Sequence, residues 1–157
     1  MPRVHFVDFP LREGMQARQH VEAMFREFAI IAAGGGHQAD VPKRLLEISE
    51  LHRERYAGLN PEADAAVDDA MQRGDAYLDF DVTVPDQIRD DTLTLAPVLL
   101  EVDAYCRNGD MLTLSPNNEI RAFWVWFLIE IVRQVNGEMP TSWHDFELPA
   151  DLRSSDE

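Results

Sequence analysis

Carboxylate side chains are the groups in this sequence best suited to chemistry. Glu47, Glu50 and Glu54 recur at steps of three and four residues, a spacing that places side chains on one face of a helix. Carboxylate oxygens from adjacent helices can hold Mg²⁺ against phosphate groups. The triplet therefore raises an enzymatic alternative based on a divalent metal and a phosphate substrate.

The same triplet resembles the first half of the magnesium-binding pattern of all-helical nucleoside triphosphate pyrophosphohydrolases. The resemblance implies a second Glu-x-x-Asp pair on the neighbouring helix. This chain offers Glu62-x-Asp64 and Glu101-x-Asp103 instead, and no cluster of Lys or Arg lies near them in the sequence. A magnesium-dependent enzyme of this class therefore stays an alternative, and we expect no catalytic, metal or cofactor site.

Other reactive side chains show no catalytic pattern. Cys106 is the only cysteine, which excludes an internal disulfide and favours a reducing, cytoplasmic location. It lies at the end of a predicted helix, where the helix dipole disfavours a thiolate. No two of the five histidines have helical ligand spacing, and the glycines at 34–36 follow a predicted helix rather than a strand. We interpret Cys106 as a packing residue and the glycines as a helix stop.

Acidic residues dominate the chain, with 29 Asp and Glu against 14 Lys and Arg and a formal net charge of -15. Between residues 60 and 103 there are twelve acidic and two basic residues. Such a surface repels polyanions, so we expect neither nucleic acid nor a membrane as a partner. A solvated surface explains most charge runs of this kind. The alternative is an acidic face that steers a basic protein partner.

Hydrophobic periodicity predicts a mainly helical chain. Apolar side chains recur at helical spacing, and Asn, Asp, Ser, Pro and Gly mark most of the expected ends. The expected helices span about residues 15–33, 40–57, 61–73, 88–107 and 117–135. Pro97 falls inside the fourth and should kink or divide it. We expect one helical domain over residues 1–150, followed by a disordered acidic tail at 151–157.

One segment has the periodicity of a strand. Residues 78–84 alternate apolar and mostly acidic side chains, as in an extended strand with one buried face. The segment around Phe6 is also β-prone. Pairing of the two would make a minor two-stranded ribbon beside a bundle of about five helices.

The last helix is the most apolar of the five, and we expect it at the centre of the bundle. Projected at about 100° per residue, it leaves a narrow stripe that holds charges and one large aromatic. The stripe contains Glu119, Ala122, Trp126, Glu130 and Arg133, with Phe123 on its edge. Trp126 and Phe123 either pack under the terminal segment 139–146 or form an intermolecular contact. Homodimerisation through this helix would satisfy both observations.

Four segments together resemble small uncharacterised helical bacterial proteins associated with anti-sigma regulatory ATPases. They are Phe25–Ile31, Pro42–Leu46, Met111–Pro116 and Phe127–Gln134. The resemblance spans about residues 9–143 and implies a regulatory association rather than an activity. The Asn-box and the Asp-x-Gly-x-Gly turn of the nucleotide-binding members do not occur in the sequence. The chain should therefore not be the nucleotide-binding partner of such a system.

The sequence thus predicts a non-catalytic regulatory or adaptor protein that needs no cofactor and binds a protein with a basic surface. The alternatives are the magnesium-dependent pyrophosphohydrolase and a structural homodimer. Acidic side chains would steer the partner and the aromatic stripe would slow its dissociation. The predicted interaction residues are Phe123, Trp126, Glu130, Arg133, Asp64, Asp68, Asp69, Asp90 and Asp91.

Overall fold

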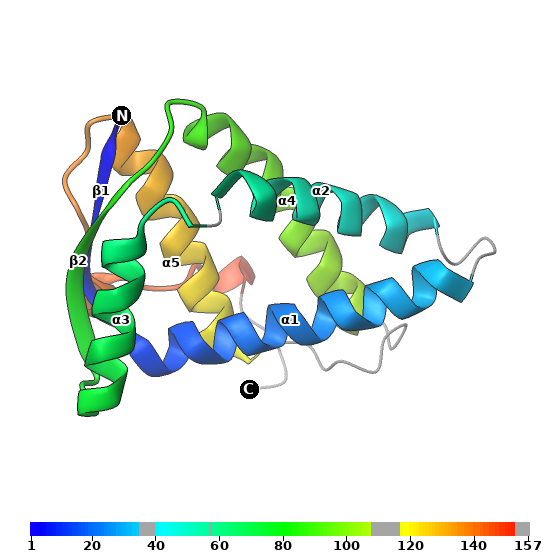
Figure 1. Cartoon of the computed structure of the whole chain (residues 1–157), viewed down its shortest axis with the longest axis horizontal. Coiled ribbons are helices and arrows are strands. Elements are labelled where there is room, and N and C mark those ends of the chain that lie inside the picture. The colour runs from blue at the N-terminus through cyan, green and yellow to red at the C-terminus, as the bar shows by residue number, and fades with distance from the viewer. Residues whose placement is uncertain (35–39, 57, 108–116, 153–157) are drawn as a thin grey trace.

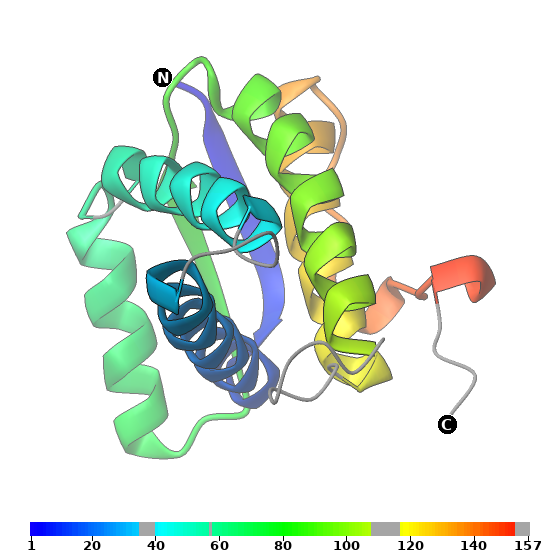
Figure 2. The same cartoon turned by 90° about the vertical axis from the view of Figure 1, so that its right-hand side faces the viewer.

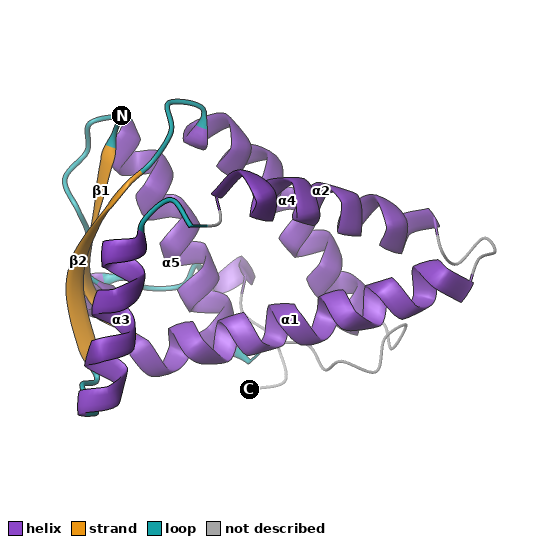
Figure 3. Ribbon diagram, in the orientation of Figure 1, coloured by secondary structure: helices purple, strands orange, loops and turns teal. Residues whose placement is uncertain are grey.

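A computed structural model describes residues 1–34, 40–56, 58–107 and 117–152 (Figure 1). It is mainly helical with one two-stranded antiparallel sheet, as the periodicity predicted (Figure 3). Within those ranges, every helix is too short or too polar to cross a lipid bilayer. The elements are β1 (Arg3–Pro10), α1 (Leu11–Gly34), α2 (Asp40–Tyr56), α3 (Pro61–Arg73), β2 (Tyr77–Thr83), α4 (Ile88–Arg107), α5 (Asn118–Val135) and the 3-10 helices η2 (Trp143–Asp145) and η3 (Ala150–Leu152).

The ribbon forms by the predicted pairing. β1 and β2 are antiparallel, with Phe6 opposite Phe80. Phe6 and Phe9 are three positions apart and would face opposite sides of a regular strand, yet both are buried. A register shift between them, with Asp8 at a φ of 57°, returns Phe9 to the inner face. Because of this irregularity, β1 presents two aromatic rings to the helices instead of one.

α1 begins at Leu11, directly after β1, whereas the apolar periodicity predicted a start near Met15. The backbone N–H of Leu11 donates to the carbonyl oxygen of Ala76, 3.1 Å away, so the chain turns from strand to helix beside the start of β2. The Leu11 side chain is buried there. This contact joins residues far apart in sequence, so the local periodicity could not indicate it.

Gly14 allows the ribbon to approach the first turns of α1. A Cβ atom at this position would lie 2.9 Å from Cε1 of Phe9, closer than two carbon atoms normally pack. The Phe9 ring is held in turn by Phe123, which it meets edge-on with ring centroids 5.4 Å apart. The ring therefore has little freedom to move away from an added methyl group.

We expect Gly14→Ala to lower the free energy of unfolding, measured by urea denaturation. Overpacking costs about 1–3 kcal/mol, which outweighs the roughly 1 kcal/mol that alanine gains over glycine inside a helix. Gly34→Ala is the matched control in the same helix, because a Cβ there meets no described atom within 4 Å. A Gly14→Ala variant more stable than the wild type would contradict the close approach.

Aromatic rings from the ribbon and α5 form the principal core. The Phe6 ring stacks on Phe127 with centroids 4.9 Å apart and lies 5.6 Å from Trp126. Phe6 and Trp126 are 1% and 0% exposed. Because a buried aromatic side chain removes about 150–250 Å² from water, these contacts hold α5 firmly against the sheet.

A second apolar cluster lies where α1, α2 and α4 meet, away from the ribbon (Figure 1). Its buried members are Met24, Phe28 and Val98, and Leu46 and Ile48 of α2 pack against them. Figure 2 shows the resulting arrangement: α4 runs beside α5, and α2 lies next to α1, with the ribbon behind them. The helices therefore join two separate packing centres.

Local signals located most helix ends correctly. α3 begins at Pro61 and ends before Gly74, which has a φ of 77°. The Asn117 side chain caps α5 by accepting from the Ile120 N–H at 2.9 Å. Pro97 was expected to kink or divide its helix; the division is wrong, because Ile88–Arg107 is one continuous helix. Residues 111–116 and 153–157, part of the resemblance and most of the predicted tail, lie outside the described ranges.

Candidate functional site

Trp126, the expected exposed aromatic, is buried. Its side chain is 0% exposed, and its indole Nε1 donates to the carbonyl oxygen of Thr141 at 2.9 Å. The Trp143 ring packs against it edge-on, with centroids 5.6 Å apart, and Phe123 is 4% exposed. Trp126 and Phe123 therefore pack under the terminal segment, and the expected exposure of Trp126 is wrong.

Glu130 is buried too, at the centre of a polar network. Its carboxylate is 1% exposed and accepts hydrogen bonds from Arg133 Nη1, Gln134 Nε2 and the Thr141 N–H, each at 2.9 Å. The Gln134 amide in turn bonds both backbone groups of His5 in β1. Glu130 and Arg133 therefore join α5 to β1 and to the terminal segment, and this stripe of α5 supports the fold.

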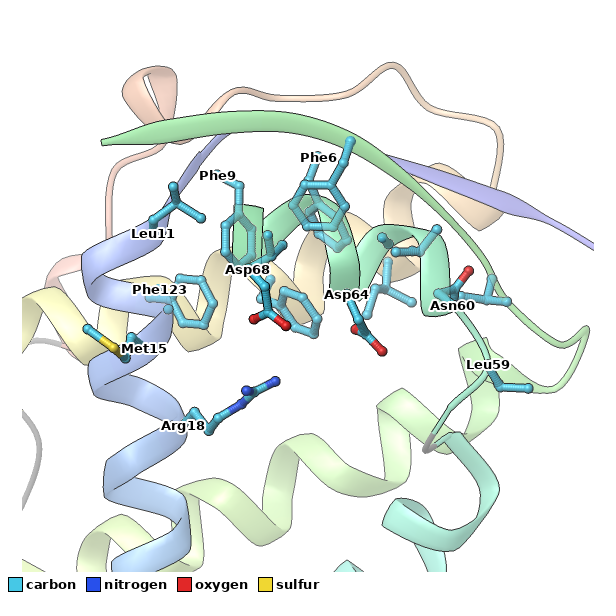
Figure 4. A pocket seen from close by; sticks show the side chains of 18 of the residues that line it. Phe6, Phe9, Leu11, Met15, Arg18, Leu59, Asn60, Asp64, Asp68 and Phe123 are labelled. Atoms are coloured by element: carbon cyan, nitrogen blue, oxygen red, sulfur yellow. The ribbon is translucent and has the colours of Figure 1, made fainter. Parts of the chain in front are cut away.

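A pocket of about 540 Å³ lies between the inner face of the ribbon and helices α1, α3 and α5 (Figure 4). The helix positions that line it recur at steps of three and four residues, so each helix presents one face to it. α1 contributes Leu11, Gly14, Met15 and Arg18, and α3 contributes Ala63, Asp64, Val67, Asp68 and Met71. The volume lies within the range of small-ligand sites, about 300–1,000 Å³.

Asn60 fixes α3 at the side of this pocket. Its side chain accepts from the Thr83 N–H at 2.8 Å and donates to the Thr83 carbonyl oxygen at 3.0 Å. These two hydrogen bonds satisfy both backbone groups of Thr83, as a neighbouring strand would, and fix the start of α3 beside the end of β2. The wall formed by α3 is therefore positioned by the ribbon.

The deep end of the pocket is aromatic. Phe6, Phe9, Phe80, Phe123 and Phe127 all line it. Among the described residues, no buried side-chain nitrogen or oxygen lacks a hydrogen-bond partner. The interior therefore suits the apolar part of a ligand, and a polar part would be recognised at the mouth.

Charged side chains of both signs surround the mouth. Figure 4 shows the guanidinium of Arg18 extending from α1 into the opening toward which the carboxylates of Asp64 and Asp68 point from α3. Asp64 and Asp68 are one helical turn apart, and all three residues are exposed. In the part of the chain that the structure describes, none of the three forms an ion pair. These charges are therefore available to a ligand.

Two exposed apolar side chains also border the pocket. Met15 on α1 is 40% exposed, and Leu59, just before α3, is 39% exposed. Arg18, Met15 and Leu59 are site residues that the sequence reasoning missed. Leu11, Met15 and Arg18 recur at steps of four and three residues. This spacing indicates that Met15 and Arg18 share a helix face with Leu11 only when the helix is known to begin at Leu11.

The other predicted acidic residues lie elsewhere. Asp69 is exposed on α3 but does not line the pocket. Asp90 and Asp91 belong to the first turn of α4, where Asp91 forms an ion pair of 2.6 Å with Arg55. The structure therefore brings Asp64 and Asp68 together at the pocket and places the other three acids away from its lining.

The carboxylates considered for magnesium do not converge. Glu47 and Glu50 are exposed on α2, while Asp64 lies at the pocket mouth. Among the described residues, no group of three His, Cys, Asp or Glu side chains is placed to hold a metal ion. No observation here favours the pyrophosphohydrolase alternative.

The chain has no significant match among protein-family models, curated proteins or solved structures. The pocket, its apolar rim and its charged mouth are therefore the features on which a proposal of function can rest.

Proposed function

We propose that the chain is a non-catalytic regulatory adaptor that binds a protein partner with a basic surface at the mouth of the aromatic pocket. The supporting observation is one opening that combines a deep apolar interior, two carboxylates without ion-pair partners among the described residues, and an exposed apolar rim. A regulatory role of the kind implied by the resemblance to proteins near anti-sigma ATPases belongs to the same proposal.

Charge would bring the partner to this face. The chain carries a net charge of -15, and Asp64, Asp68 and the nearby Asp69 project from α3 into solvent. Such a field accelerates encounter with a basic surface and weakens as salt rises. Asp90 at the start of α4 adds to it. Asp91 adds less, because its side chain is 19% exposed and paired with Arg55.

Apolar contact would then retain the partner. An apolar side chain that enters between Met15 and Leu59 reaches the aromatic interior, and burial of this kind mainly slows dissociation. Phe123 would supply this contact from the floor of the pocket rather than from an exposed patch on α5, and Trp126 would support Phe123 from behind, with ring centroids 6.3 Å apart.

We expect Asp64→Lys/Asp68→Lys to abolish recovery of the partner in affinity purification from the native cell, quantified by mass spectrometry. The double variant places two cations where the wild type has two carboxylates. Glu47→Lys/Glu50→Lys is the matched control: it changes the net charge by the same amount at exposed positions of α2 that do not line the pocket.

A protein retained by the wild type and by the α2 control, but lost with the α3 variant and at raised salt, would support the proposal. Equal recovery by all three forms would rule out the pocket mouth as the docking site. Loss in both double variants would assign the effect to net charge alone.

A further inference from the structure

The mouth of the pocket carries charges of both signs. A purely basic partner would pair with its carboxylates and leave its guanidinium unpaired. Asp64 and Asp68 on α3 suit a cation, but Arg18 on α1 extends into the same opening. A ligand with only a positive charge would approach Arg18 unfavourably, and a ligand with only a negative charge would meet two carboxylates. A group that carries both charges satisfies both sides.

We infer that the pocket binds a free α-amino acid with a large apolar side chain, or a close derivative of one. Its ammonium group would lie against Asp64 and Asp68, its carboxylate would pair with Arg18, and its side chain would enter the aromatic interior. Arginine presents paired N–H groups that match a carboxylate.

The pocket's interior is matched to the apolar half of such a ligand. Phe9 and Phe123 meet edge-on with ring centroids 5.4 Å apart, Phe6 stacks on Phe127 at 4.9 Å, and all four rings line the cavity. Aromatic rings pack well against one another, either edge-on or stacked with an offset. The volume of about 540 Å³ accommodates a ring as large as indole together with its ammonium and carboxylate groups.

Binding would interact with the proposed adaptor function, because Asp64 and Asp68 belong to both surfaces. A bound amino acid would occupy the carboxylates that the basic partner needs and so compete with it. Only this competition rests on the proposed function; the ligand site rests on the pocket itself.

The test uses three ligands that share the indole ring: L-tryptophan, tryptamine, which lacks the carboxylate, and indolepropionate, which lacks the ammonium group. Affinities are measured by isothermal titration calorimetry. For the wild type we expect tryptophan to bind best and indolepropionate least, since the mouth holds two carboxylates and one guanidinium. Loss of the carboxylate should weaken binding by up to about fivefold, the upper range for one exposed ion pair, and loss of the ammonium group should weaken it further, because that group faces two carboxylates.

Two variants separate the two charge contacts. Arg18→Ala should remove the preference for tryptophan over tryptamine while leaving tryptamine as tight or tighter. Asp64→Asn/Asp68→Asn should remove the preference for tryptophan over indolepropionate. Glu47→Gln/Glu50→Gln on α2 should leave all three affinities unchanged. All of these side chains are exposed, so circular dichroism should show an intact fold in each variant.

Absence of binding by all three ligands at millimolar concentration, or equal binding of the three to the wild type, would overturn the inference. A preference for tryptophan that persists in both pocket variants would overturn it as well. If these titrations fail while Asp64→Lys/Asp68→Lys still abolishes partner recovery, the ligand site is refuted and the adaptor function stands.

Discussion

Replacing Trp126 by alanine should lower the free energy of unfolding by about 3–5 kcal/mol, the range for large aromatic side chains removed from a core. The indole is 0% exposed and contacts rings from three parts of the chain, Phe6 in β1, Phe123 in α5 and Trp143 in the terminal segment. Truncation would leave a cavity among these rings and would free the carbonyl oxygen of Thr141.

Chemical denaturation followed by circular dichroism measures this loss. Trp126→Phe keeps most of the apolar volume and removes the hydrogen bond to Thr141, so it should lose only about 1–2 kcal/mol and remain folded if the alanine variant does not. Ile129→Ala is the control on the same helix, because Ile129 is 39% exposed. If Trp126→Ala lost no more unfolding free energy than Ile129→Ala, the indole would lie at the surface, as the charged stripe of α5 suggested.

Replacing Glu130 by glutamine should lower the free energy of unfolding by about 1–3 kcal/mol, the range for a buried hydrogen-bonding group left without its partner. The carboxylate accepts three hydrogen bonds, and an amide of the same shape must turn its own N–H groups toward one of those donors. Glu130→Ala would remove the acceptor oxygens of all three hydrogen bonds and should lower the free energy of unfolding by about 3–5 kcal/mol. Glu50→Gln, at an exposed carboxylate of α2, should change stability by less than about 0.5 kcal/mol.

Amide hydrogen exchange gives a local measure of the same substitution. The His5 N–H donates to the Gln134 side chain at 2.7 Å, and Gln134 is oriented by Glu130 at 2.9 Å. The Thr83 N–H is the reference, since it donates to the side chain of Asn60 at 2.8 Å, outside this network. In Glu130→Gln the exchange of His5 should accelerate more than that of Thr83. Equal acceleration would mean that Glu130 acts only on global stability.

Trp126 and Glu130 also support the pocket. Phe123 borders the pocket and contacts both Trp126 and Trp143, with ring centroids 6.3 Å and 6.5 Å apart. The terminal segment therefore packs behind the pocket floor, and Glu130 holds that segment in place through the Thr141 N–H. Changes at Trp126 or Glu130 should consequently weaken the proposed binding indirectly, through Phe123, whereas changes at Asp64 or Arg18 should alter the proposed contacts directly.

Features that depend on neighbouring residues could be predicted from the sequence. The alternation of apolar and acidic residues at 78–84 identified β2, since each strand side chain faces opposite to the next. Pro61 and Gly74 bounded α3 because proline suits a helix start and glycine readily adopts a positive φ. Asp64 and Asp68 share a face of α3 for a local reason as well, because they are four residues apart in one helix.

Features that depend on distant residues were decided only by the tertiary structure. On a helical projection Trp126 and Glu130 belong to the charged stripe of α5, but the terminal segment folds back over that stripe and buries both. The pocket likewise needs α1, α3, α5 and the ribbon in place before Arg18 can lie opposite Asp64. The periodicity of a helix shows which side chains share a face, whereas the free energy of burial depends on which segment covers that face. Composition and periodicity thus determined an acidic, mainly helical chain, and packing between distant segments determined which charges remain available to a ligand.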